Sequence, residues 1–128
     1  MSLEVIVPVG SAPPLAPYSP GIKAGGFIYV SGTLAVGPNG ETLAVGDAAA
    51  QTRIVLESIK SVIETAGGTL RQVVFNQIFL KDLADYAAMN AVYREYFPEN
   101  PPARFCIRAD LVRPDFLVEL ATTAYVGD

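Results

Sequence analysis

Apolar positions open the chain in a strand-like run and then give way to a proline-rich arm. Residues 5–26, VIVPVGSAPPLAPYSPGIKAGG, favour a short first strand and then an extended, non-helical segment, because proline lacks the N–H that helices and sheets use. FIYVSG at 27–32 has the aromatic and branched residues of a β-strand, which Gly32 ends. The Pro-Asn-Gly turn in GPNGET at 37–42 predicts that the next segment returns antiparallel as a further strand.

In two later segments the apolar residues are spaced as they are on one face of an α-helix. The first helix is predicted to begin after a cap at Asp47 and to stop at Gly67 and Gly68. Its apolar face comprises Val55, Ile59, Val62, Ile63 and Ala66. A second helix is predicted from residues that step by three and four, and the PENPP stretch at 98–102 ends it. These residues are Leu83, Tyr86, Asn90, Tyr93 and Phe97.

The remaining apolar segments are strands. VVFNQIFL at 73–80 is apolar on both faces, which is typical of a strand inside a covered sheet. Residues 103–109 and 116–126 are two final strands around a turn at 113–115, and a simple hairpin would place Arg104 opposite a residue near Thr122. The order of elements predicts an α+β fold, with a mixed sheet and both helices on one face. The other face is expected to be apolar and to need a partner.

Composition narrows the class of protein. A chain of 128 residues that is 51% apolar, without a long apolar run or a basic leader, is expected to form one domain over 1–128, in the cytoplasm and not in a membrane. The net charge of −4, with scattered Lys and Arg, argues against nucleic acid as a partner. The positive mean hydropathy favours an oligomer, because a small core hides little apolar surface.

The sequence has no histidine and a single cysteine, which excludes several kinds of chemistry. A Ser-His-Asp triad, a Cys-His pair, a His-ligated zinc and an internal disulfide are all impossible, and no metal site is expected. Proton transfer must therefore use Glu, Asp, Tyr, Lys, the thiol, the backbone or water.

Two charges interrupt the final strands. Arg104 shares one face of 103–109 with Cys106 and Arg108, and Glu119 is a lone carboxylate on an apolar face of the last strand. Because burying an unpaired charge costs several kcal/mol, these groups either reach water at a sheet edge or line a site. Arg104 is then either an edge arginine whose stem covers apolar surface or a planar fork that grips a carboxylate. Glu119 is either half of a salt bridge or a carboxyl whose pKa is raised for proton transfer through water.

Three further residues have a structural and a functional interpretation. Cys106 is either a nucleophile or a structural and ligand-contacting residue, and the lack of histidine favours the second. Asn90 lies in the apolar row of the second helix and makes either a core hydrogen bond or a ligand contact. Tyr18 is either an aromatic anchor of the arm or a lid over a pocket.

Several segments together resemble the Rid family of reactive-intermediate deaminases, also called the YjgF family. They are APYSPGI at 16–22, YVSGTL at 29–34, FLKDLADYAAMNAVYREYFPENPPARFCI at 79–107 and LVELATTAYV at 117–126, with PPAR before a cysteine as the most specific element. The resemblance implies homotrimers of chorismate-mutase-like subunits with clefts at the interfaces, and no cofactor. It implies that Arg104 binds a small carboxylate substrate and that Glu119 positions water and moves protons. Tyr18, Gly32, Asn90 and Cys106 match positions that line the cleft, and Arg108 is then a solvated or structural charge.

Within the family, Phe105, Thr33 and the block at 50–70 are similar to the RutC branch of pyrimidine catabolism. That similarity implies hydrolysis of 3-aminoacrylate to malonic semialdehyde and ammonia. A general 2-imino or 2-aminoacrylate deaminase and a non-catalytic module that binds small carboxylates remain alternatives. A ribonuclease fits poorly with the lack of histidine and of basic surface, and reduction of an aminoacrylate peracid requires a reductant that the sequence does not suggest.

Overall fold

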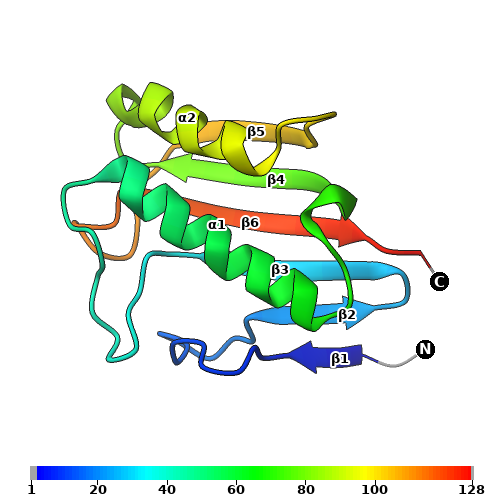
Figure 1. Ribbon diagram of the computed structural model, residues 1–128. Helices are drawn as coiled ribbons and strands as arrows, with labels where there is room; N and C mark the ends of the chain where they lie inside the picture. Colours follow the sequence, from blue (N-terminus) through cyan, green and yellow to red (C-terminus); the bar gives the residue numbers. More distant parts are fainter. Residues whose placement is uncertain (1–2, 128) are drawn as a thin grey trace.

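The chain folds as one six-stranded mixed sheet with two α-helices against one face (Figure 1). This is a computed structural model that describes residues 3–127. The strands are β1 Leu3–Ile6, β2 Gly21–Ala24, β3 Phe27–Thr33, β4 Val73–Leu80, β5 Ala103–Arg108 and β6 Val118–Tyr125. The helices are α1 Ala48–Thr65 and α2 Tyr86–Tyr96, with 3-10 turns at Leu70–Gln72 and Leu83–Asp85. The sheet order is β1-β2-β3-β6-β4-β5, which confirms the predicted α+β class.

Helix α1 begins and ends where the sequence predicts. The side chain of Asp47 accepts a hydrogen bond from the Ala50 N–H at 3.0 Å, which satisfies one of the free N–H groups of the first turn. Gly67 follows the helix at a φ of 91°, a left-handed conformation that glycine adopts without a steric penalty. The predicted apolar face is buried against the sheet, where Ile59 and Ile63 are inaccessible to solvent.

Helix α2 begins later than its apolar period suggests. Leu83 lies in the preceding 3-10 turn and is 52% exposed, so its assignment to the buried face was wrong. Tyr86 of the predicted row is exposed as well, and Met89 and Val92 join the predicted Tyr93 on the buried side of the helix. Neither helix of residues 3–127 combines the length and the apolar character that spanning a membrane requires.

The first hairpin differs from the prediction. The end of the proline-rich arm forms β2, which turns at Gly25 and Gly26 and pairs antiparallel with β3. The Pro-Asn-Gly turn leads back only to an isolated bridge between Val36 and Thr42, so the expected further strand is absent from the described residues. The other edge of β3 is already paired with β6, so the segment after the turn cannot pair with β3 as a further strand.

The predicted hairpin of the last two strands is also wrong. β5 pairs parallel with β4, because α2 serves as the crossover connection that a parallel pair needs. β6 enters the sheet between β3 and β4 and pairs antiparallel with both. Asn76 of β4 is the neighbour of Arg104 on one side and of Thr122 on the other, so these two residues lie level in the sheet but two strands apart.

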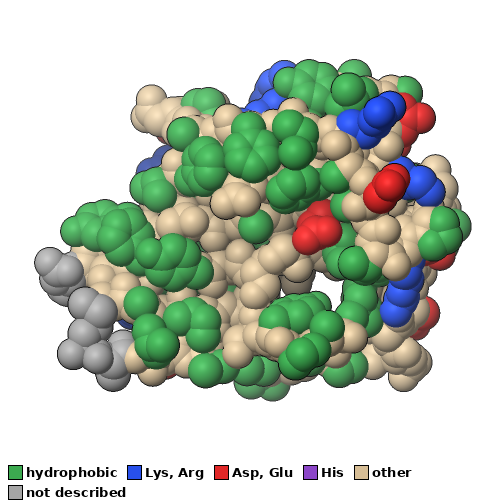
Figure 2. Space-filling model, turned by 180° about the vertical axis from the view of Figure 1, so that it is seen from behind, with side chains coloured by type: hydrophobic (Ala, Val, Ile, Leu, Met, Phe, Trp, Pro, Cys, Tyr) green, Lys and Arg blue, Asp and Glu red, His purple; other side chains and the backbone are tan. Residues whose placement is uncertain are grey.

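The sheet face opposite the helices is apolar, as predicted. Phe27, Tyr29 and Tyr125 form one exposed aromatic group, with Phe27 contacting both tyrosine rings. Figure 2 views the molecule from this side and shows hydrophobic side chains spread over much of the surface. A second group surrounds the ring of Phe105, which contacts the Phe75 and Phe79 rings edge-on. We call the whole sheet face opposite the helices the open face.

Candidate active site

Glu119 lies on the open face, in a cleft with mostly apolar walls. Its position in β6 is paired with Phe79 of β4. The cleft has a volume of about 460 Å³ and is lined by Leu15, Ala16, Tyr18, Ser31, Gly32, Leu34, Val112 and Glu119. Burial raises the pKa of the Glu119 carboxyl, which favours the proton-transfer interpretation over the salt bridge. We call this cleft the Glu119 half-site.

Gly32 makes room for this carboxyl group. A Cβ atom at residue 32 would clash with Oε2 of Glu119, well inside van der Waals contact. The pairing of β3 with β6 is irregular between Val30 and Thr33, which brings the backbone of residue 32 close to the acid. The structure therefore brings together Gly32 and Glu119 because glycine permits a close approach of backbone to side chain.

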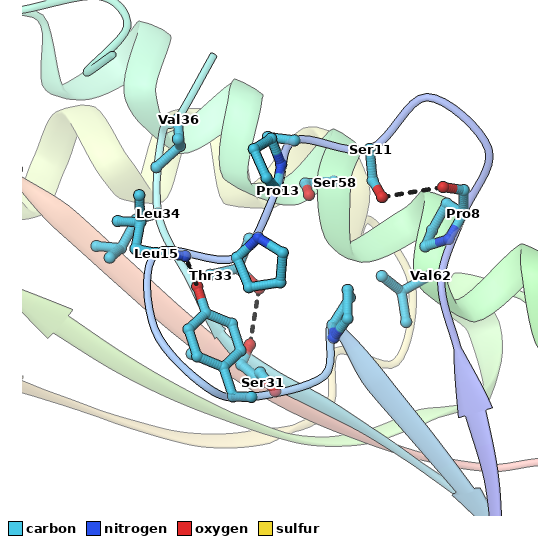
Figure 3. Close-up of a pocket in the computed structure, with 15 residues that line it drawn as sticks. Pro8, Ser11, Pro13, Leu15, Ser31, Thr33, Leu34, Val36, Ser58 and Val62 are labelled. Atoms are coloured by element: carbon cyan, nitrogen blue, oxygen red, sulfur yellow. Dashed lines mark hydrogen bonds between the residues drawn. The ribbon is translucent and has the colours of Figure 1, made fainter. Parts of the chain in front are cut away.

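Tyr18 lies in the same cleft because the proline-rich arm folds back over the end of β3. The Ser31 hydroxyl donates to the Ser19 carbonyl, and the Leu15 N–H donates to the Tyr18 hydroxyl at 3.4 Å. Figure 3 shows a small pocket beneath the arm, which is lined by Pro13 and Leu15 of the arm and by Thr33 of β3. The arm thus forms one wall of the Glu119 half-site, and the idea of Tyr18 as a closing lid stays a prediction.

Arg104 lies in β5 on the other side of the sheet, next to α2. Its Nη2 donates to the Tyr86 hydroxyl at 3.0 Å, and its Cζ lies 4.7 Å from the centre of the Tyr93 ring. The surrounding cleft has a volume of about 390 Å³ and is lined by Tyr86, Asn90, Tyr93, Arg94, Phe97, Pro101, Pro102 and Arg104. We call it the Arg104 half-site, and it unites two predicted residues, Arg104 and Asn90.

No carboxylate of residues 3–127 pairs with Arg104. The ion pairs within 4 Å in this part of the chain are Arg53 with Glu95 and Arg71 with Glu99. Aromatic rings and one hydroxyl hold the guanidinium, which leaves further N–H groups for an anion. This environment suits the carboxylate-binding interpretation of Arg104.

Cys106 follows Arg104 on the same face of β5 and packs partly against the core. Burial raises the pKa of its thiol, although the nearby charge of Arg104 acts in the opposite direction. The group is therefore mostly protonated at neutral pH, which favours the structural and ligand-contact interpretation over a nucleophile. Cys106 is not among the residues that line either half-site in this single chain.

The predicted site residues fall into two groups on opposite faces of the sheet. Asn76, Arg104 and Thr122 occupy neighbouring positions that face the helices. Glu119 is three residues before Thr122 in β6 and so points to the other face. One chain therefore brings Tyr18 and Gly32 to Glu119 and Asn90 to Arg104, and it keeps the acid apart from the arginine.

Tyr86 and Tyr93 are contacts of Arg104 that the sequence did not identify as site residues. Both were assigned only to the apolar row of the second helix. Their spacing with Asn90 already places all three on one helical face, which is the available sequence signal. Among residues 3–127 no three acidic, cysteine or histidine side chains gather in an arrangement suited to a metal ion.

Comparison with known proteins places these observations in a family. The model of a family described as Endoribonuclease L-PSP matches residues 9–126. The chain is 56% identical to the 3-aminoacrylate deaminase RutC of Acinetobacter baylyi, with 98% of this chain and 100% of that protein aligned. The crystal structure of RidA from an Antarctic Psychrobacter species is similar, with a TM-score of 0.88, 31% identity and coverage of 96% and 99% of the two chains. So is E. coli TdcF with bound serine, at a TM-score of 0.86, 28% identity and coverage of 95% and 98%.

Proposed function

The chain belongs to the Endoribonuclease L-PSP family, in agreement with its resemblance to Rid proteins, and on that premise we propose that it is a 3-aminoacrylate deaminase. Full-length identity of 56% to a deaminase of this substrate is the observation that carries the proposal. The two half-sites support it, because one offers an arginine to a carboxylate and the other offers a carboxyl group with a raised pKa. TdcF with bound serine is a related structure that holds a small carboxylate.

The proposed reaction consumes one water and needs no external electrons. A proton adds to C2 of 3-aminoacrylate while the nitrogen lone pair moves to form a C3=N iminium. Water then adds to C3, and the C3–N bond breaks to release ammonia and malonic semialdehyde. The enamine itself supplies the electron pair for the new C–H bond, so this route requires no cofactor.

Each half-site has a distinct role in this route. The fork of Arg104 binds the substrate carboxylate and so fixes the distance from C2 and C3 to the acid. Glu119 gives its proton to C2, and its carboxylate then takes a proton from the attacking water. A raised pKa suits this cycle, because a carboxyl group that both gives and takes a proton works best when its pKa is near the operating pH. Tyr18, Gly32, Asn90 and Cys106 are proposed to line the cleft.

The complete site requires two copies of the chain. Arg104 and Glu119 lie on opposite faces of one sheet, and the open face presents aromatic groups that need cover. A contact between unlike surfaces closes into a ring when the rotation between subunits returns to the first one, and the family resemblance implies a ring of three. We therefore propose a homotrimer in which the Arg104 half-site of one subunit meets the Glu119 half-site of the next.

Mixed assemblies test this arrangement. Arg104→Ala and Glu119→Gln proteins, each inactive alone, are expected to regain about one quarter of wild-type activity after unfolding and refolding together in equal amounts, because half of the sites receive an intact arginine and half of those an intact acid. The measurement is ammonia release by the refolded mixture. The same mixture without the unfolding step is the control. If both residues acted in one chain, refolding together would restore nothing.

Ammonia release from 3-aminoacrylate and from 2-aminoacrylate, each generated in situ, tests the reaction itself. We expect faster release from the 3-isomer than the uncatalysed rate, by about 10²- to 10⁴-fold if proton transfer is the main contribution. A preference for the 2-isomer would instead support a general imine deaminase. Failure to accelerate either reaction would support a carboxylate-binding module, and the net charge of −4 still argues against RNA as the substrate.

A further inference from the structure

A chain of buried polar groups runs beneath α2 and ends at the Arg104 half-site. The Thr122 hydroxyl donates to Oδ1 of Asn76 at 2.6 Å, and Nδ2 of Asn76 donates to the Tyr93 hydroxyl at 2.9 Å. Asn76 is 0% exposed, Thr122 3% and Tyr93 5%. The three side chains come from β6, β4 and α2, so the hydrogen bonds tie the helix to the middle of the sheet.

The ring of Tyr93 is the surface on which Arg104 rests. The guanidinium carbon lies 4.7 Å from the centre of this ring, closer than the 5.8 Å to the Tyr86 ring. Phe97 packs against Tyr93 with the ring centres 4.7 Å apart. Tyr93 is thus held by Phe97, which packs against its ring, and by Asn76, which donates to its hydroxyl, and Arg104 lies over the ring.

Core packing alone does not explain the polar groups at these positions. A buried amide or hydroxyl is costly unless its hydrogen bonds are made, and apolar residues fill such space without that risk. The arrangement has a definite direction, because the Thr122 donor fixes Oδ1 of Asn76 toward β6 and so turns Nδ2 toward Tyr93. This series of hydrogen bonds specifies the position of the Tyr93 hydroxyl, and with it the tilt of the Tyr93 ring.

We propose that Tyr93 is a positioning residue for carboxylate recognition by Arg104, and that Asn76 and Thr122 act through it. The inference rests on the proposed role of Arg104 in substrate binding. A ring held at a fixed tilt keeps the guanidinium plane at one angle, so that its remaining N–H groups meet both oxygens of a carboxylate. Tyr86 completes the support, because its hydroxyl accepts from Nη2 at 3.0 Å.

Tyr93→Phe tests the inference, because it keeps the ring and removes only the hydroxyl. We expect KM for 3-aminoacrylate to rise about fivefold, the size of a weakened cation–π contact, with kcat within about twofold of wild type. The Kd of 3-hydroxypropionate, an unreactive carboxylate of similar size, should rise by the same factor in calorimetric titration. Thr122→Val interrupts the same chain from its far end and is expected to raise both constants about threefold. Thr122→Val also provides the test if Tyr93→Phe does not fold.

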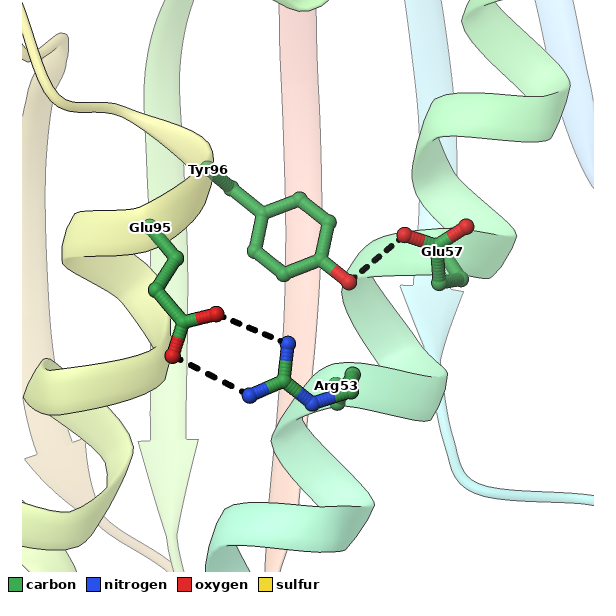
Figure 4. Close-up of polar contacts among 4 residues, drawn as sticks. All are labelled: Arg53, Glu57, Glu95 and Tyr96. Carbon is green, nitrogen blue, oxygen red and sulfur yellow. Dashed lines mark hydrogen bonds and ion pairs between the residues drawn. The ribbon is translucent and has the colours of Figure 1, made fainter.

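Tyr96→Phe is the matched control. Tyr96 lies one turn further along α2, and its hydroxyl donates to Glu57 of α1 at 2.6 Å on the outer surface (Figure 4). The same atom is removed from the same helix without a contact to Arg104, so KM and Kd should stay at wild-type values even if Tm falls.

Equal KM and Kd in wild type, Tyr93→Phe and Thr122→Val, with only Tm lowered, would overturn the positioning role. The proposed role of Arg104 in substrate binding is tested separately. If wild type binds 3-hydroxypropionate but releases no ammonia, the deaminase proposal falls and the Kd comparison still decides the role of Tyr93. If wild type binds no carboxylate at all, both inferences are wrong.

Discussion

Arg104→Ala is expected to lower kcat/KM for 3-aminoacrylate by about 10²- to 10³-fold, because a substrate without its carboxylate anchor loses its alignment with the proton donor. The fold should survive, since Arg104 makes one side-chain hydrogen bond, to the partly exposed Tyr86, and no ion pair among residues 3–127. Steady-state ammonia release and Tm, measured on the same preparation, separate the two effects. An unchanged kcat/KM would show that the arginine does not bind the substrate.

Two variants sharpen this result. Arg108→Ala removes an exposed arginine from the same strand and the same face and should leave kcat/KM unaltered, so a general loss of positive charge is excluded as the cause. Arg104→Lys keeps the charge and loses the planar fork, and its activity is expected to lie between those of Arg104→Ala and wild type. Equal losses in Arg104→Ala and Arg108→Ala would point to long-range electrostatics in place of a bound carboxylate.

The sequence predicted local features well because local features depend on neighbouring residues. The cap at Asp47, the stop at Gly67 and the buried side of α1 follow from propensity and period within a few turns of chain. The alternation in β5 and β6 also held, with Arg104 and Cys106 on one face and Glu119 on the apolar face of its own strand. The same local pattern offered a raised pKa as one of two interpretations of Glu119, since its neighbours in the strand are apolar.

Strand pairing escaped prediction because it depends on segments that are distant in sequence. Two consecutive strands joined by a short turn usually pair, yet β6 pairs with β3 and β4, and β5 with β4 alone. Only that pairing decides that the face of Arg104 is the helix side and that of Glu119 the open side. The sequence pattern therefore pointed to Arg104 and Glu119 as candidate residues, and their separation onto opposite faces, on which the proposed two-subunit site rests, emerged from the sheet order.

Glu119→Gln should lower turnover about 10²- to 10⁴-fold, the usual contribution of a positioned proton donor, and should not lower Tm at pH 7. The expected sign for stability follows from the raised pKa of Glu119 in the folded chain. A folded-state pKa above the unfolded value stabilises the fold at acid pH, and this contribution is lost as the pH rises through the folded pKa. Above the folded pKa the ionised carboxylate destabilises the fold, and glutamine removes this penalty, so Tm of the variant should equal or exceed that of wild type.

Glu95→Gln is a control for which a change in Tm of the opposite sign is expected. Arg53 donates to both oxygens of Glu95 across α1 and α2, at 2.9 and 3.1 Å, and this contact lowers the pKa of the acid (Figure 4). An acid with a lowered folded-state pKa stabilises the fold above the unfolded pKa, and this contribution is lost as the pH falls. Glu95→Gln should therefore reduce Tm slightly at pH 7, with ammonia release unchanged. Thermal unfolding from pH 4 to pH 8 distinguishes the two acids. The advantage of Glu119→Gln over wild type should grow with pH, and a Tm lowered at pH 7 would mean that Glu119 stabilises the fold through a partner in the assembly.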